Sequence, residues 1–330
     1  MIAYLARRIT WSLFTIWAVV TLTFLVYNFL PEDPARVMAG PQARPADVAR
    51  IRAQLELDRP LPVRYWKYLS GLVNVVSAGA ESSDSALALG PLRIDLGVSY
   101  LKRRPVVELL GKALPATLLV GVLALAIQIA IGAAAGTIAA QRRHSVFDWG
   151  TVGLTLVGIS APTFLTGLVL QHFLARELNL FPLDGYGETT HERLSSAVLP
   201  SLTLGMFGAA YYTRLVRDEM IVLLKQDHVR TARAKGLGEL AVVVKHGLRN
   251  ALMPLVTVVG LSMGTLVGGA IVTEKIFRWP GIGALSVDAV VERDGPVIMG
   301  VVILFSTVVV LSNLIVDLSY ALLDPRVRRE

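Results

Sequence analysis

Three cations stand among small residues in the segment RTARAKGLG, which interrupts a chain made largely of long apolar runs. The cations are Arg230, Arg233 and Lys235. Such a segment could bind a partner protein through its charges. It could also simply anchor the flanking apolar runs on one side of a membrane, where short loops are rich in Lys and Arg.

The residues around these cations predict a short helix. Asp227 can cap its start through a side-chain oxygen, and Gly236 can end it in the left-handed conformation that glycine adopts cheaply. The helix would have about two turns, and Ala232 and Ala234 would let another protein approach its surface closely. A loop that only anchors two spans needs no capped helix followed by a second one, GELAVVVKHGLRNALMP, so the pattern favours docking.

Patterns for catalysis and nucleotide binding are absent from the sequence. It contains no G-x-x-x-x-G-K-[ST] phosphate loop, so energy for transport must come from a partner. The chain has no cysteine and no histidine cluster, which argues against disulfides and metal ligation. Ser160 and His172 lie about 18 Å apart along one predicted helix, too far for a nucleophile and its base to bond. We therefore predict no enzyme activity and no cofactor in this chain.

Small and helix-breaking residues within the apolar runs mark candidate contacts. Gly260, Gly264 and Gly268 recur at every fourth position and would share one helical face, where a neighbouring backbone can come close. That face could pack within the chain, or it could meet a partner subunit or a pathway. Pro162, in GISAPTFLTG, removes one helix hydrogen bond and predicts a kink or hinge.

Polar side chains inside the apolar runs are few. The four candidates are Gln128, His172, Asn313 and Asp317. We expect helix-to-helix hydrogen bonds, or hydration at the ends of spans, to satisfy them. Acidic residues near a membrane midplane are nearly absent, which argues against an ion-driven secondary transporter.

The elements that position these residues are predicted membrane spans. Hydrophobic residues make up 54% of the chain and charged residues 17%, as in multispan membrane proteins. A span needs about 20 mostly apolar residues. Six stretches qualify: 9–30, 114–139, 150–175, 198–216, 251–272 and 297–323. Prolines that follow leucine, at Pro115, Pro200 and Pro254, predict helix starts.

Six spans place both termini on one side of the membrane, and the distribution of Lys and Arg selects the cytoplasm for that side. The net charge of +7 is spread over loops and termini, which favours membrane orientation over nucleic-acid binding. The predicted domains are a tail and first transmembrane helix at 1–30, an extracytoplasmic subdomain at 31–113, and a five-helix core at 114–330 with a cytoplasmic loop at about 218–250.

The segment DHVRTARAKGL, with HGLRNALMP after it, resembles the cytoplasmic loop of binding-protein-dependent ABC importer permeases, especially the dipeptide and oligopeptide B-type permeases. The wider family has Glu-Ala-Ala, three residues, then Gly; this chain keeps Ala232 and Gly236 but places Arg230 and Thr231 first. Further resembling stretches span nearly the whole chain: LELDRPLPVRYWKYL, DLGVSY, RPVVELLGKALPAT, GAIVTEKIFRWPGIG and NLIVDLSYALLDPRVR. The segment 77–94, which precedes DLGVSY, is longer than is usual in the family.

The resemblance implies an all-α type I ABC importer permease in the bacterial inner membrane. It implies a second homologous permease, two cytoplasmic ATPase subunits that bind ATP and Mg, and an extracytoplasmic substrate-binding protein. It assigns ATPase coupling to Asp227, Arg230, Thr231, Ala232, Arg233, Ala234, Lys235 and Gly236. Di- and oligopeptides are the expected solutes, and a nickel complex, glutathione or an oligosaccharide are the alternatives.

Overall fold

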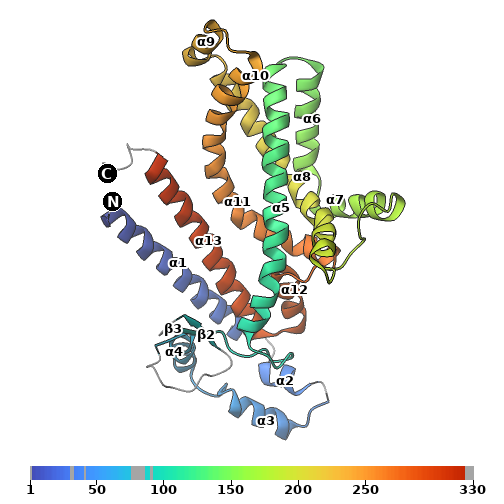
Figure 1. The fold of residues 1–330 in the computed structure, drawn as a ribbon. Helices are drawn as coiled ribbons and strands as arrows, with labels where there is room; N and C mark the ends of the chain where they lie inside the picture. The colour runs from blue at the N-terminus through green and yellow to red at the C-terminus, as the bar shows by residue number, and fades with distance from the viewer. Residues whose placement is uncertain (1, 30–32, 41, 76–85, 90–91, 324–330) are drawn as a thin grey trace. The chain divides into compact units, whose positions relative to one another are not determined.

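The computed structural model describes residues 2–29, 33–40, 42–75, 86–89 and 92–323, which are mostly helical (Figure 1). The chain divides into two compact units. One unit comprises Met1–Pro115 with Leu285–Val310, and the other comprises Ala116–Ala284 with Leu311–Glu330.

Six helical runs coincide with the six predicted spans. They are α1 Ile2–Phe29, α5 Val106–Gln141, the broken run of α6 Val146–Ser160, α7 Thr163–Leu170 and the π-helical η1 Gln171–Glu177, then α8 Thr190–Leu223, α11 Arg249–Ile276 and α13 Gly295–Leu323. Four helices of the described residues are long and apolar enough to cross a membrane, and the broken run makes a fifth if it counts as one span. The predicted class, an all-α membrane protein, is confirmed. The span predicted at 251–272 falls inside α11, where several side chains lie outside the described part, and it stays a prediction.

The predicted helix starts at proline are wrong. Pro115, Pro200 and Pro254 all lie inside helices, which begin several residues earlier. At α8 the start is set by a capping box, in which Thr189 and the Glu192 side chain bond each other's backbone N–H groups. A reciprocal cap satisfies two orphan donors at once, so the helix begins there and accommodates the later proline.

Pro162 breaks its span, as the sequence predicts. Helix α6 ends at Ser160, Pro162 stands immediately before α7, and the two helices meet at an angle of 105°. A bend this large exceeds a simple proline kink, because the backbone of Ala161 leaves the helical conformation altogether.

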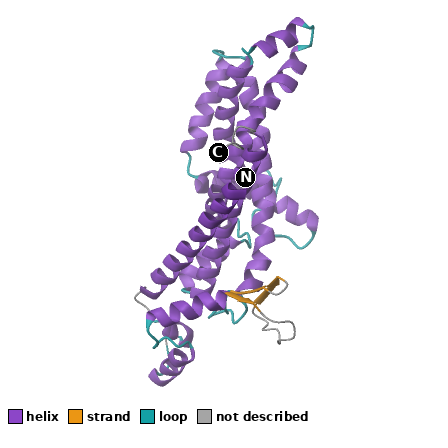
Figure 2. Ribbon diagram, turned by 90° about the vertical axis from the view of Figure 1, so that its left-hand side faces the viewer, coloured by secondary structure: helices purple, strands orange, loops and turns teal. Residues whose placement is uncertain are grey.

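The first unit carries three short helices and a small sheet between its long helices. They are α2 Pro34–Ala39, α3 Pro45–Gln54, α4 Leu61–Leu72, and an antiparallel sheet of β1 Val73–Val75, β2 Ala86–Leu89 and β3 Leu92–Asp95 in the order β1-β3-β2. Figure 2 shows the three strands together as one small sheet. The stretch 77–94, which is long for the resembled family, contains β2 and the first three residues of β3, and its residues 77–85 and 90–91 lie outside the described part. Helix α12, Ile282–Glu292, connects α11 to α13.

In the second unit, α5 and α8 pack closely because glycine removes side chains from their contact. A Cβ at Gly132 would lie 2.5 Å from Tyr212 Cβ, and one at Gly136 would lie 2.6 Å from the Thr213 carbonyl oxygen. Gln128 Nε2 also donates across this contact to the Leu204 carbonyl, at 3.1 Å. The glycines of α5 therefore serve packing within the chain.

Candidate functional site

The segment with the three cations forms helix α9, Asp227–Ala234 (Figure 1). The residue before it, Gln226, makes no capping hydrogen bond, and the predicted cap by Asp227 is wrong. Asp227 is the first helical residue, and its carboxylate is 97% exposed and lies 3.7 Å from Arg230 Nη1. A cap must precede the first turn to reach its free N–H groups, so Asp227 contributes only a favourable charge near the helix start.

The helix ends at Gly236 as predicted. Gly236 has φ +78°, and its N–H donates to the Arg233 carbonyl at 2.9 Å, while Leu237 N donates to the Ala232 carbonyl at 3.4 Å. This pair of bonds is a Schellman motif, which satisfies two carbonyls that the helix end would leave open. Since an added Cβ would find nothing within 4 Å, the requirement for glycine here comes from the backbone alone.

The inner face of α9 is apolar and buried. Val229 and Ala232, spaced three residues apart, pack with Val242 in one small cluster against Leu224. The prediction that Ala232 lies on an open surface is therefore wrong, because the helix uses that position to hold itself onto the following segment. Leu224 directly follows α8, so the cluster ties α9 to α8 as well.

The outer face of α9 carries the exposed polar residues. Arg230, Thr231, Ala234 and Lys235 are all exposed. Arg233 is committed within the chain, since its Nε and Nη2 donate to the Glu239 carboxylate at 3.0 and 2.6 Å. This pairing holds the pKa of Glu239 below its usual range. Lys235 has no ion pair among the described residues, so it and Arg230 are the cations offered outward.

The segment after α9 links it to a long helix. α10, Glu239–Ala241, leads into the π-helical η2, Val242–Leu248, and then directly into α11. Gly247 of η2 is so close to α8 that an added Cβ would lie 2.9 Å from Met220 Cε. Packed side chains therefore connect α9, through η2, to both α8 and α11.

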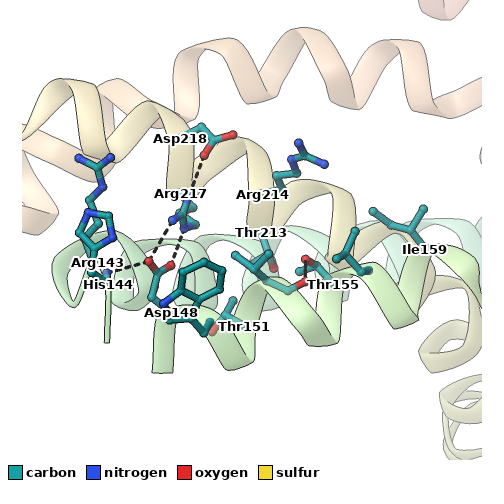
Figure 3. A pocket seen from close by; sticks show the side chains of 13 residues that line it. Arg143, His144, Asp148, Thr151, Thr155, Ile159, Thr213, Arg214, Arg217 and Asp218 are labelled. Atoms are coloured by element: carbon teal, nitrogen blue, oxygen red, sulfur yellow. Dashed lines mark hydrogen bonds and ion pairs between the residues drawn. The ribbon is translucent and has the colours of Figure 1, made fainter. Parts of the chain in front are cut away.

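An ion pair that the sequence interpretation missed joins α6 to α8 in the same unit (Figure 3). Arg217 Nε and Nη2 donate to the buried carboxylate of Asp148 at 2.6 and 3.0 Å, and His144 N donates to it at 3.0 Å. A bidentate pair of this kind fixes orientation as well as distance. The sequence did contain a signal for this pair, because Asp148 and Arg217 carry opposite charges next to two predicted spans.

A second missed residue is Glu274, near the end of α11. Its buried carboxylate accepts from Thr117 Oγ1 at 2.7 Å and from Ala284 N at 2.9 Å. Thr117 Oγ1 in turn accepts from Ile282 N at 2.8 Å. A Cβ on Gly283 would lie 2.9 Å from the carboxylate and 2.6 Å from Ile271 Cα, so glycine is required for this turn to close. The motif GAIVTEKIFRWPGIG thus encodes a compact polar turn, which we name the Glu274 turn.

The remaining predicted candidates lie away from α9 in sequence and in separate elements. Pro162 stands between α6 and α7, and Gly260, Gly264 and Gly268 lie in α11. The surroundings of Gly264 and Gly268 are outside the described part of the chain.

Three of the polar span residues also lie elsewhere. His172 Nε2 is 3.8 Å from the Glu177 carboxylate in η1. Asn313 is exposed on α13, and the Asp317 side chain lies outside the described part. These residues belong to other elements than α9. Among the described residues, those of α9 are the only predicted group that the structure brings together.

Comparisons with known proteins cover both units. A family model described as a binding-protein-dependent transport system inner membrane component matches residues 132–329, and the N-terminal model of the same transport-system membrane components matches residues 1–121. The glutathione transport system permease protein GsiC of Escherichia coli strain K12 is 39% identical over 328 residues, which cover 99% of both chains. The proteins of that name from Salmonella paratyphi A and Shigella dysenteriae are similar to the same extent and over the same coverage.

Proposed function

Because this chain belongs to the family of binding-protein-dependent transport system inner membrane components, we propose that it forms half of the solute pathway in an ABC importer, beside a second homologous permease. The chain is the permease subunit of such an importer and not an enzyme. ATP and Mg would be bound by two cytoplasmic ATPase subunits, and an extracytoplasmic binding protein would deliver the solute.

The observation that carries the proposal is the division of α9 into two faces. The inner face, with Val229 and Ala232, is packed against the segments that continue into α8 and α11. The outer face presents Arg230, Thr231, Ala234 and Lys235. A helix that is exposed on one side and joined to two long helices on the other can receive the movement of an ATPase and pass it to the membrane.

The orientation proposed for this arrangement follows the Lys and Arg distribution. Both termini and the loop at about 218–250 would lie in the cytoplasm, and residues 31–113 would lie outside. The five-helix core would begin near residue 114, within the long helix α5.

The solute proposed for this importer is a short peptide. Relatives at 39% identity are named for glutathione transport, and glutathione is itself a tripeptide. These names support a small peptide of that kind as the first solute to test. A nickel complex or an oligosaccharide finds no comparable support in the names of these relatives.

The decisive experiment begins with purification of the tagged chain in mild detergent and identification of stoichiometric partners by mass spectrometry. A second permease and an ATPase are expected. Because the chain has no cysteine, a single Ala234→Cys then maps the contact by cross-linking, and Ala232→Cys on the buried face of the same helix is the matched control. Ala234→Cys should capture the ATPase and Ala232→Cys should not.

Two results would contradict this proposal. A stable homo-oligomer without ATPase, obtained where control complexes survive, would favour a self-contained, ion-driven transporter. Recovery of the ATPase with no cross-link from Ala234→Cys would keep the importer assembly and reject the contact through α9.

A further inference from the structure

A cavity of about 400 Å³ opens between α6 and α8 in the second unit. Its wall on α6 is largely apolar and is formed by Trp149, Val152, Leu156 and Ile159, while its α8 side and one end carry charged residues. The charged lining residues are Arg143, Asp148, Arg214, Arg217 and Asp218, and His144 lies beside them. None of these groups takes part in the proposed contact of α9.

The charges in this α6–α8 cavity are only partly neutralised. Arg217 pairs with Asp148 and also donates to Asp218 at 2.9 Å, so one guanidinium serves both carboxylates. The side chains of Arg143 and Arg214 have no ion-pair or hydrogen-bond partner among the residues that the structure describes. Figure 3 shows them on either side of the Asp148–Arg217 pair. Three arginines face two aspartates in this lining, which leaves a net charge of one positive unit. The two arginines without a partner, Arg143 and Arg214, are both exposed.

Arg214 carries its positive charge close to the apolar part of α8. Arg214 lies in α8 within the apolar stretch 198–216 and one turn before Arg217, where the polar end of the helix begins. A charge at this depth is costly in hydrocarbon unless it meets water or an opposite charge. Its long stem can carry the guanidinium to the headgroup region, where lipid phosphates lie.

The apolar wall fits the remainder of a lipid. Trp149 is 70% exposed and Leu156 is 54% exposed, although both line the cavity. Tryptophan is enriched at the membrane interface, and the aliphatic residues that follow it along α6 extend the apolar surface away from the charged end. A ligand with one anionic end and an apolar body would meet both surfaces.

We propose that the α6–α8 cavity binds an anionic phospholipid, whose headgroup phosphate is attracted by Arg143 and Arg214 while an acyl chain lies along Trp149 and Leu156. Basic pockets between transmembrane helices bind such headgroups in other membrane proteins. The bound lipid would neutralise the excess charge and fill the space between α6 and α8 beside the Asp148–Arg217 pair. No residue of α9 lines this site, and the proposal does not depend on the identity of the solute.

The test uses Trp149 as a local probe. The purified assembly that carries this chain is reconstituted in phosphatidylcholine vesicles with a minor share of brominated phosphatidylglycerol or, in parallel, of brominated phosphatidylcholine. Bromine quenches tryptophan fluorescence on contact, so stronger quenching by the glycerol lipid reports its enrichment near a tryptophan. We expect this headgroup-selective quenching in the unchanged protein and its loss in Trp149→Phe.

Charge variants then identify the residues responsible. Arg143→Gln combined with Arg214→Gln should abolish the selective quenching, and Arg143→Lys combined with Arg214→Lys should keep most of it, because lysine still attracts phosphate. Arg142→Gln is the matched control, since Arg142 is the neighbouring arginine in the same turn and does not line the cavity. If the double glutamine variant fails to insert, Arg143→Gln alone and the lysine variant decide.

Three outcomes would overturn the proposal. Equal quenching by the two brominated lipids in the unchanged protein would show that no anionic lipid is enriched. A loss in Arg142→Gln as large as in the double variant would assign the effect to general loop charge. Removal of the selective quenching by soluble glycerol phosphate would assign the cavity to a water-soluble phosphate ester instead of a membrane lipid.

Discussion

The segments at the two ends of α11 use charge in opposite ways. At one end, α9 and η2 keep cations at the surface, and the helix is held by the apolar contact of Val229 and Ala232 with Val242. At the other end, Glu274 is fully buried, and its carboxylate is satisfied by Thr117 and by backbone N–H groups. A polar group whose hydrogen bonds are all made within the chain stabilises the fold, whereas an exposed cation is available to bind a partner.

Glycine differs between the two ends as well. Gly236 is needed for its left-handed backbone and has open space around it, while Gly283 is needed because Ile271 and Glu274 leave no room for a Cβ. The same residue type is therefore a conformational requirement at α9 and a packing requirement at the Glu274 turn. Substitutions should affect coupling at the first site and folding at the second.

The largest effect is expected from Gly283→Ala. The new Cβ would lie 2.6 Å from Ile271 Cα, and backbone cannot yield as a flexible side chain does. Overpacking of this kind costs about 1–3 kcal/mol or more, so the yield of folded protein and its melting temperature should fall. Gly150→Ala is the control, because nothing lies within 4 Å of its Cβ position. Equal stability of the two variants would contradict the tight turn.

Gly236→Val should abolish transport while leaving membrane insertion intact. A β-branched residue in the left-handed conformation costs about 1–3 kcal/mol, which distorts the end of α9 without touching the core. ATP hydrolysis should continue in the assembled complex without solute uptake into vesicles. The matched control is Gly238→Val, since Gly238 has φ −62° and open space around it. Normal uptake by Gly236→Val would sink the coupling role.

Val229→Ala should weaken coupling without abolishing it. Removing two buried methyl groups from the contact with Val242 costs about 2 kcal/mol, which loosens the attachment of α9 to η2 and leaves its outer face unchanged. Uptake per ATP hydrolysed should fall several-fold, while ATPase binding persists in a pull-down. Val244→Ala on the exposed side of η2 is the control. An unchanged ratio of uptake to hydrolysis would mean that this cluster does not carry the movement.

The smallest effect is expected from the pH dependence of the Arg233–Glu239 pair. Arg233 lowers the pKa of Glu239 from its ordinary value of 4.5. The ion pair therefore stabilises the connection between α9 and α10 above that pH, and this contribution is lost as the pH falls through the lowered pKa. Hydrogen exchange at residues 234–240 should therefore rise below about pH 4.5 relative to Glu239→Gln measured at each pH. A constant difference between the two proteins across this window would contradict the contribution of the pair.

Several local features of these segments could be predicted from residues close in sequence. The end of α9 at Gly236 followed from glycine chemistry, and the break at Pro162 followed from proline chemistry. The cap at Asp227 was predicted wrongly, because the helix begins at Asp227 itself, one residue earlier than a cap at this position requires. Ala232 was misplaced because its small size fits an open surface and a tight buried contact equally well.

The sequence by itself determined the apolar helices, the short basic helix and the family to which the chain belongs, since these depend on composition, periodicity and local order. Only the tertiary structure decided which face of α9 is buried, that Asp148 meets Arg217, and that Thr117 satisfies Glu274. The reason is physical. Backbone preferences act between near neighbours, whereas partners that are far apart in sequence are chosen by how whole helices pack.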